Sequence, residues 1–471
     1  MTPSKRLASA LAALVLAGSA AAADLGQVYR LAAQNDPVLR EAEANYFAAR
    51  ETKPQAWALY LPQLNGYADA VNSDSDATTP FFDVNTSQFV TRPVTTNSTS
   101  HTQSLELRQT VFNWSEIKGI QAAGAAVAQA EAEYDAALQE FIVRTADRYF
   151  GQLSTADQLE AQRLNREALG NQLEQSKKRF EVGLIAVTDV QESQAAYDQA
   201  IADEIAAERA FQSSREQLRV STGDYVDDLT RPGEDMPLKD PQPASPDAWV
   251  KLALEQNLSL VASRFAAEAA AHSLGAAWGS HFPTVDLVAS KSHFTRDTDQ
   301  TLDTGSGLVS SHSGADQDGN TYSLQLAVPL FAGGATQSKV RQAKYRSRAA
   351  DDRLERVTRE TQRQARDALL GVTTEISRTK ALRQAAESSA TALRATEAGF
   401  EVGTRTSVDV IDSRRNLLRA QVTYRRAKYD YLLNTLRLKQ AAGMLVEADV
   451  TQVNTWLTNT AAPTPMGEPT K

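Results

Sequence analysis

The plan of the chain follows from Phe400-Glu401-Val402-Gly403-Thr404-Arg405-Thr406-Ser407-Val408-Asp409-Val410-Ile411-Asp412, a stretch that joins two long helical segments. A near-copy occurs earlier as Phe180-Glu181-Val182-Gly183-Leu184-Ile185-Ala186-Val187-Thr188-Asp189-Val190. Each copy reads as a helix end, a tight turn and a new helix start. Gly183 and Gly403 suit the left-handed position that closes a helix, because glycine has no Cβ to clash there. The sequence therefore predicts two helical hairpins, with these two turns as their tips.

Polar residues that can cap the outgoing helix follow each of these glycines. In the first copy, Thr188 with Gln191 three residues later fits a capping box. In the second copy, Ser407, or Thr406 with Asp409, fits the same role. Carboxylates near a helix start also complement its positive end. We expect capped helix starts near residues 188 and 407.

Long helices are predicted on both sides of each tip. The segments Trp114–Phe180 and Gly334–Phe400 contain no proline and little glycine. At about 1.5 Å of rise per residue, each would be roughly 100 Å long. The return segments are Thr188–Thr222 and Ser407–Gly443, and shorter helices are expected over Leu25–Tyr60 and Asp247–Ser280. Such helices bury too little surface alone, so they must pack side by side as in coiled coils.

Two segments alternate apolar and polar residues, which is typical of strands with one apolar face. These are Ser104–Phe112 and Ser323–Phe331, with weaker partners at Leu61–Val71 and Pro283–Phe294. Their lengths match tilted membrane-spanning strands. Between the partners, Asn72–Gln103 and Thr295–Asn320 are rich in polar residues, and we expect long external loops there. The alternative is a pair of ordinary soluble hairpins.

Landmarks of the first half recur in the second. Ala56-Trp57 returns as Ala277-Trp278, and the tip glycine returns after 220 residues (403 − 183). The chain therefore reads as a tandem duplication. The predicted plan is a signal peptide at 1–23, a first repeat at 24–230, a Pro-rich extended linker at 231–246, a second repeat at 247–445 and a C-terminal tail at 446–471.

The N-terminus has the pattern of a secretory signal peptide. Lys5 and Arg6 precede the apolar run Leu7–Leu16, and small residues lead to a predicted cleavage after Ala23. This removes two positive charges and no negative ones, so the formal charge of −9 becomes −11 (−9 − 2). An acidic mature chain argues against nucleic acid as a partner, because phosphate binding needs a basic surface.

The composition also argues against an enzyme. The absence of cysteine excludes disulfides, thiol catalysis and cysteine-ligated zinc. The histidines form no His-x-x-x-His pair and no helical Glu-x-x-His ligand set, and no Gly-x-x-x-x-Gly-Lys phosphate loop occurs. We therefore expect no catalytic residues, no metal site and no cofactor.

The number of strands argues for an assembly of several chains. A single chain offers four predicted strands, whereas the smallest membrane barrels have about eight. Open strand edges cannot face lipid unpaired. Several chains must therefore contribute strands to one barrel, and cyclic symmetry would close the ring. Three chains would supply twelve strands, a count that the argument favours without forcing it.

Both tips, Phe180–Gln191 and Phe400–Asp412, resemble those of the TolC family of outer-membrane export channels. So does Tyr429-Asp430-Tyr431-Leu432-Leu433-Asn434. The resemblance covers the mature chain except its tail. It implies an α+β membrane protein, a homotrimer with a 12-stranded β-barrel in the outer membrane that continues into a long periplasmic α-helical barrel. The lack of an N-terminal cysteine matches the non-lipidated branch.

The resemblance also implies a function and partners. It implies the outer-membrane export conduit of a tripartite efflux pump or a type I secretion system. The expected partners are a periplasmic adaptor (membrane fusion) protein, an inner-membrane transporter of the RND, ABC or MFS type, and outer-membrane lipid. The alternative, a periplasmic coiled-coil adaptor or structural rod, fits poorly with the duplicated strands. The cargo stays open, because the pump selects it.

By resemblance, the tips form the aperture that admits substrate. Asp409 and Asp412 lie three residues apart and so share a helix face. Threefold symmetry would turn them into two carboxylate rings that select cations. The alternative is two solvated carboxylates that cap a helix.

Contacts that close the aperture are also expected by resemblance. They map onto Thr188 and Asp189 in the first tip and Arg405 in the second, with an Arg405–Asp189 ion pair as the expected latch. Lys178 and Phe400 stand where the family pattern has glutamine and tyrosine. Because Phe400 has no hydroxyl to donate, that part of the lock is left open.

Overall fold

The computed structural model describes residues 22–83, 86–234, 236–458 and 466–467. The chain divides into two compact units. Unit 1 takes its residues from 1–44, 133–260 and 357–471, and unit 2 from 45–132 and 261–356. Each unit therefore draws on both halves of the sequence. The predicted signal peptide, residues 1–23, lies outside the described residues except for Ala22 and Ala23.

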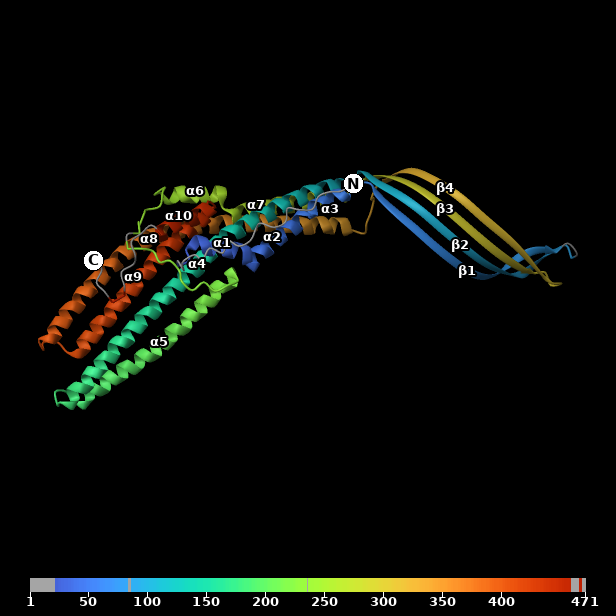
Figure 1. The fold of residues 1–471 in the computed structure, drawn as a ribbon. Coiled ribbons are helices and arrows are strands. Elements are labelled where there is room, and N and C mark those ends of the chain that lie inside the picture. The colour runs from blue at the N-terminus through green and yellow to red at the C-terminus, as the bar shows by residue number, and fades with distance from the viewer. Residues whose placement is uncertain (1–21, 84–85, 235, 459–465, 468–471) are drawn as a thin grey trace, which may run out of the picture. The chain divides into compact units, whose positions relative to one another are not determined.

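Unit 2 contains an antiparallel sheet in the order β1-β2-β3-β4 (Figure 1). Its strands are β1 Gln63–Asp83, β2 Gln88–Phe112, β3 Thr284–Asp303 and β4 Leu308–Ala327. The central pair, β2 with β3, joins a strand of the first half of the chain to a strand of the second. Strands β1 and β4 are the two edges of this sheet.

The long polar loops predicted over Asn72–Gln103 and Thr295–Asn320 are wrong. Both segments are mostly strand, and the four strands are 20 to 25 residues long. A short turn closes the second hairpin, where the Thr304 N–H donates to Gly307 O at 3.0 Å. The prediction was wrong because polar Ser and Asn side chains indicate exposure to water, whereas strand pairing depends on hydrogen bonds between backbone N–H and C=O groups. The frequent β-branched Thr also favours strands.

One face of the sheet carries exposed apolar side chains. Leu64 lies opposite Leu107, and Leu287 lies opposite Leu324, so these partners share a face. All four side chains are exposed. Strand β4 ends at Ala327 instead of the predicted Phe331, because Pro329 has no N–H to continue the ladder. A large exposed apolar face of this kind marks a membrane or protein contact.

The first helix of each half is interrupted, which the sequence analysis did not predict. The segment from Leu25 forms α1 Leu25–Asn35, α2 Pro37–Arg50 and α3 Thr52–Ala58, and the later one forms α6 Pro246–Gln256 and α7 Leu258–Gly279. Asp36 precedes a proline, which disfavours helical backbone, and its Oδ1 accepts from the Val38 and Leu39 N–H groups at 2.8 and 3.1 Å. Asn257 restarts the later helix in the same way, since its Oδ1 accepts from the Leu260 N–H at 3.0 Å.

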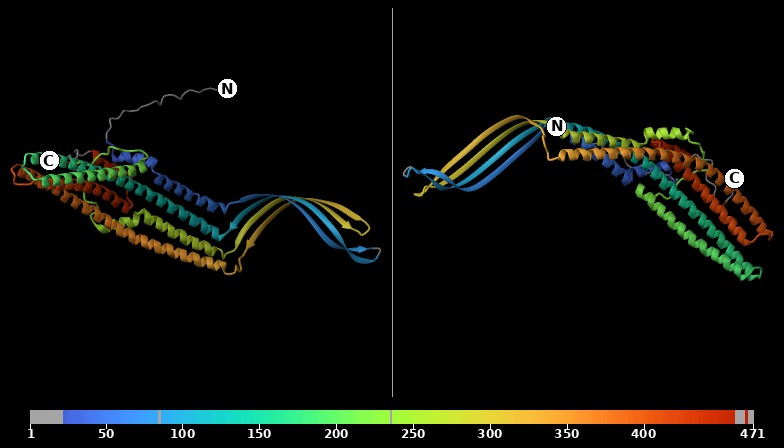
Figure 2. Two further views of the ribbon diagram at one scale, coloured as in Figure 1. Left: turned by 90° about the horizontal axis from the view of Figure 1, so that it is seen from below. Right: turned by 180° about the vertical axis from the view of Figure 1, so that it is seen from behind.

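Two helical hairpins form as predicted. The first consists of α4 Trp114–Glu181 and α5 Val187–Thr222, and the second of α8 Ala335–Glu401 and α9 Ser407–Ala441. Within unit 1 the two tips lie at the same end (Figure 2). No described helix is both long and apolar enough to span a membrane.

The core of unit 1 lies where α1, α4, α8 and α9 meet. Tyr149, Phe150, Tyr429 and Leu432 are among its buried residues. The predicted linker, 231–246, is not a free spacer, because Met236 is buried in this core. The predicted C-terminal tail, 446–471, begins with helix α10 Glu447–Thr458, which buries Val450, Val453 and Leu457. Their helical spacing in the sequence was a signal that the prediction overlooked.

Candidate functional site

Both hairpin tips close their incoming helix in the same way. Gly183 and Gly403 have φ +77°, as the sequence predicted. The Gly183 N–H donates to Phe180 O and the Leu184 N–H to Arg179 O, both at 2.9 Å. The second tip repeats this pattern from Gly403 to Phe400 and from Thr404 to Gly399, at 3.1 and 2.8 Å. The paired bonds satisfy carbonyl groups that a helix end leaves open.

The second tip is capped by Thr406. Its hydroxyl accepts from the Asp409 N–H at 3.2 Å, and Asp409 Oδ2 accepts from the Thr406 N–H at 2.8 Å, which completes a capping box. Of the two predicted caps, Thr406 is therefore right and Ser407 wrong. The Thr188–Gln191 box is also wrong, because α5 begins after Ala186, which has no side-chain cap. A helix start two residues earlier places Thr188 inside the first turn.

We expect Thr406→Ala to loosen the second tip. Losing a threonine cap favours fraying of the first turn of α9, so trypsin should cleave after Arg405 roughly fivefold faster. The measurement is the rate of appearance of that fragment by mass spectrometry. Thr188→Ala is the control, and it should leave cleavage after Arg179 unchanged. Acceleration by both variants would contradict the assigned caps.

The two carboxylates expected to line an aperture have partners in their own helix. Hydrogen bonds from the Thr406 N–H and hydroxyl hold the pKa of the Asp409 carboxyl below its ordinary value, and the Arg405 charge adds to this. Asp412 Oδ1 pairs with Arg415 Nη2 at 2.8 Å. The sequence reasoning missed Arg415, although its spacing of three residues from Asp412 was visible.

The other predicted residues are exposed or half-buried at the tips. Lys178, Thr188 and Asp189 are exposed. Arg405 lies beside Gly399, to whose carbonyl its N–H donates at 3.2 Å. Within the part of the chain that the structure describes, Arg405 and Asp189 do not form an ion pair.

The two hairpins touch near their tips through Ser407 and Phe400, whose partners Gln172 and Arg179 the prediction did not name. Gln172 Nε2 of α4 donates to Ser407 Oγ of α9. The Arg179 guanidinium lies 4.8 Å from the centre of the Phe400 ring, a cation–π distance. Phe400 therefore has a role that needs no hydroxyl. No local pattern announces these pairs, because each joins residues more than 200 positions apart (407 − 172 = 235; 400 − 179 = 221).

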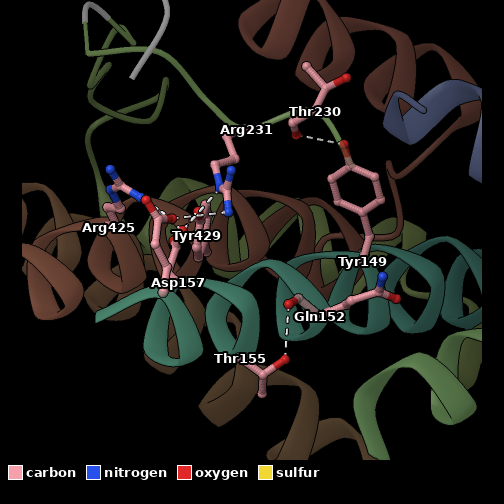
Figure 3. A network of polar contacts seen from close by, with 9 residues as sticks. Tyr149, Gln152, Thr155, Asp157, Thr230, Arg231, Arg425 and Tyr429 are labelled. Carbon is pink, nitrogen blue, oxygen red and sulfur yellow. Dashed lines mark hydrogen bonds and ion pairs between the residues drawn. The ribbon is translucent and has the colours of Figure 1, made fainter. Parts of the chain in front are cut away.

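Farther from the tip, on α4, the buried carboxylate of Asp157 binds three partners from distant parts of the chain (Figure 3). Asp157 Oδ1 accepts from Arg231 Nε and from Arg425 Nη1, both at 3.0 Å, and its Oδ2 accepts from the Tyr429 hydroxyl at 2.6 Å. The side chain of Asp157 is 1% exposed and that of Arg425 is 7% exposed. Burial, and then the Asp157 charge, raise the pKa of the Tyr429 hydroxyl, so it remains a donor.

This buried network fastens the segment after α5 to both hairpins. Arg231 belongs to that segment, Asp157 to α4, and Arg425 to α9. The Tyr149 hydroxyl adds a bond to Thr230 O at 2.7 Å (Figure 3). Lys428 lies 3.5 Å from the Glu234 carboxylate, while burial lowers the pKa of its amine. The network joins α4 and α9 directly at this level.

Among the described residues, no group of three or more His, Asp or Glu side chains is arranged to hold a metal ion. The tips instead combine exposed apolar side chains with charged ones. Val182 and Leu184 are exposed in the first tip and Val402 in the second, and the charged Asp189 and Arg405 are also exposed.

Known proteins resemble the chain along nearly its whole length. A family model described as outer membrane efflux protein matches residues 28–224 and 249–444. The chain is 34% identical over 436 residues to the outer membrane protein TolC of Vibrio cholerae serotype O1, covering 93% of this chain and 94% of that protein. It is 29% identical over 444 residues to the alkaline protease secretion protein AprF of Pseudomonas aeruginosa, covering 93% and 88%.

A solved structure has the same fold. The Campylobacter jejuni CmeC outer membrane channel matches with a TM-score of 0.69 at 17% identity, covering 93% of this chain and 90% of that one. At this identity the likeness concerns the fold alone.

Proposed function

The chain belongs to the outer membrane efflux protein family, and from this premise we propose that three copies join into one conduit from the periplasm to the outside. The observation that carries the function is the match of the family model to both halves, residues 28–224 and 249–444. Together with relatives named TolC and a protease secretion protein, it makes the chain an outer-membrane exit channel for efflux pumps and type I secretion. Its helical part lies in the periplasm.

The trimer is supported by the edges of the sheet. Strands β1 and β4 leave a row of backbone N–H and C=O groups without a neighbour in the described chain. Such groups are costly in lipid, and they are satisfied if β4 of one copy pairs with β1 of the next. Four strands from each of three copies give a 12-stranded barrel, and the two hairpins of each copy would surround a common tunnel.

We also propose the division into two repeats, 24–230 and 247–445, joined by residues 231–246. Its support is that the family model matches the chain twice, once in each half. Equivalent residues end the two returning helices, since Gly223 follows α5 and Gly443 follows α9, with φ +83° and +74°.

Partnership with an adaptor and an inner-membrane transporter follows from the family. We propose that the adaptor is of the membrane fusion type and contacts the tips, where Val182, Leu184 and Val402 are exposed. Exposed apolar side chains ringed by charges are typical of protein contacts. A transporter of the RND, ABC or MFS type would lie beyond the adaptor and select the cargo.

At the aperture, we propose that Asp409 and Asp412 form two carboxylate rings and that Lys178, Thr188, Asp189, Phe400 and Arg405 help to close it. The lowered pKa of Asp409 supports a charged ring, because it keeps the carboxyl ionised. The contact of Phe400 with Arg179 supports a closing role that replaces a hydroxyl hydrogen bond. Arg405 would then meet Asp189 of a neighbouring copy.

Planar-bilayer recording tests this proposal. The purified full chain should form cation-selective channels, and Asp409→Asn with Asp412→Asn should lower the ratio of cation to anion permeability by roughly twofold or more. Arg405→Ser keeps both carboxylates and should instead raise single-channel conductance. A chain that inserts but never conducts would contradict the conduit. An unchanged selectivity would remove the two aspartates from the aperture and leave the conduit standing.

A further inference from the structure

Met466 does not belong to a helix, yet its side chain is buried, with 5% of the residue exposed. It packs in one apolar cluster with Ala161 of α4 and Leu418 of α9, and Leu164 and Val422 pack against that cluster. The cluster therefore gives Met466 apolar contacts on both helices. A methionine suits such an irregular site, because its unbranched thioether adapts to the space between two helices.

Gly467 adds a directional contact beside this anchor. Its N–H donates to Gln421 Oε1 of α9 at 2.9 Å. Gly467 has φ +84°, which L side chains rarely adopt. An apolar side chain and a backbone hydrogen bond therefore hold two consecutive residues at one position on the helices.

The site lies in a groove between α4 and α9. Ala161, Leu418 and Val422, which pack with Met466, also line an adjoining cleft of about 280 Å³ between the two helices. Direct bonds between the two helices occur on either side of this level. Arg425 binds Asp157 toward one end, and Ser407 binds Gln172 toward the tips. Between these two levels, Met466 touches both helices.

We propose that the groove between α4 and α9 is a docking site for Met466 and Gly467 of the same chain, with the Met466 side chain as the anchor. Because α4 belongs to the first hairpin and α9 to the second, docked Met466 clamps the two hairpins together between the Asp157 network and the tips. The proposal rests on contacts within unit 1 and does not depend on the conduit function.

Paired cysteines test the docking directly, because the chain has no native cysteine. Under mild oxidation, the full chain with Leu164→Cys and Met466→Cys should form an intrachain disulfide roughly tenfold faster than the pair Arg163→Cys and Met466→Cys. Arg163 is the matched control, since it adjoins Leu164 in sequence but pairs with Glu204 and Glu208 of α5. Equal rates, or a product that joins only separate chains, would overturn the proposal.

Labelling of the groove tests the anchor. In the full chain with Leu418→Cys, Met466→Asp should raise the rate of maleimide labelling roughly tenfold, because burial of a side chain of this size favours the docked state by at least that factor. Met466→Leu keeps an apolar side chain of similar size and should leave the rate unchanged. Circular dichroism verifies that both variants fold. A labelling rate that Met466→Asp does not change would overturn the role of Met466.

Discussion

Gly443→Ala is expected to lower the free energy of unfolding of unit 1 by more than about 4 kcal/mol, although it adds only a methyl group. Gly443 has φ +74° and closes α9, where its N–H donates to Gln440 O at 2.9 Å. An added Cβ would lie 2.1 Å from Gln256 O and 2.8 Å from Asn257 N. These are main-chain atoms, so no side-chain rotation relieves the overlap.

The contact is also fixed from the other side. Asn257 lies at the junction of α6 and α7, and its Nδ2 donates to Ala441 O at 3.0 Å. Either the end of α9 or that junction must therefore move to admit a methyl group. Movement would break the bond from Asn257, which adds to the cost of the overlap.

Gly403→Ala separates the overlap from backbone strain. Gly403 has φ +77°, but nothing lies within 4 Å of its would-be Cβ. Only the left-handed backbone is then penalised, by about 1–2 kcal/mol. Denaturant titration followed by circular dichroism should give a much lower midpoint for Gly443→Ala than for Gly403→Ala. Equal midpoints would show that the overlap with Gln256 adds no cost beyond the strain of the left-handed backbone.

Asp157→Ala is expected to be nearly as damaging, by about 3–5 kcal/mol, because it takes a hydrogen-bonded carboxylate away from a buried arginine. The Arg425 side chain is 7% exposed, and it would lose its 3.0 Å contact with Asp157 while the Glu160 carboxylate lies 3.6 Å away. The Tyr429 hydroxyl would also lose its acceptor. An unpaired buried donor costs more than the bond itself contributed.

Glu160→Ala is the matched control for this prediction. It removes a carboxylate from the same cluster, but Glu160 is more exposed than Asp157. Its contact with Arg231 is also longer, at 3.4 Å compared with 3.0 Å. Its loss should lower stability by about 0–1 kcal/mol. The measurement is the denaturation midpoint followed by tryptophan fluorescence, to which Trp249 contributes from the core that also contains Tyr429. If Glu160→Ala were as destabilising as Asp157→Ala, the network would not be centred on Asp157.

The hairpins could be predicted because their signals are local. Gly183 and Gly403 meet a backbone requirement that their own neighbours create, and the long helices lack the proline that would break them. The error at the first cap was also local, because the sequence pattern did not fix the first residue of α5 to within two positions. Thr188 and Ala186 are two residues apart, and only the bonds of the turn decide that α5 begins at Val187.

Other errors arose where structure depends on distant partners. The strands extend through polar segments because β1, β2, β3 and β4 satisfy one another's backbone groups, which no single segment reveals. Asp157 and Arg425 are 268 residues apart in sequence. At the tips, Asp409 and Arg405 were named as candidate site residues from the resemblance, whereas the contact of Phe400 with Arg179 depends on how two hairpins pack.

The sheet in unit 2 has two unsatisfied margins, β1 and β4. A single copy would therefore be unstable in the hydrocarbon layer, since each edge strand would enter it with unpaired backbone N–H and C=O groups. If three copies close one barrel, as proposed, insertion and the association of the copies are a single event. The yield of finished pores would accordingly depend on how many newly delivered copies meet at one spot, more steeply than on how fast any one of them folds.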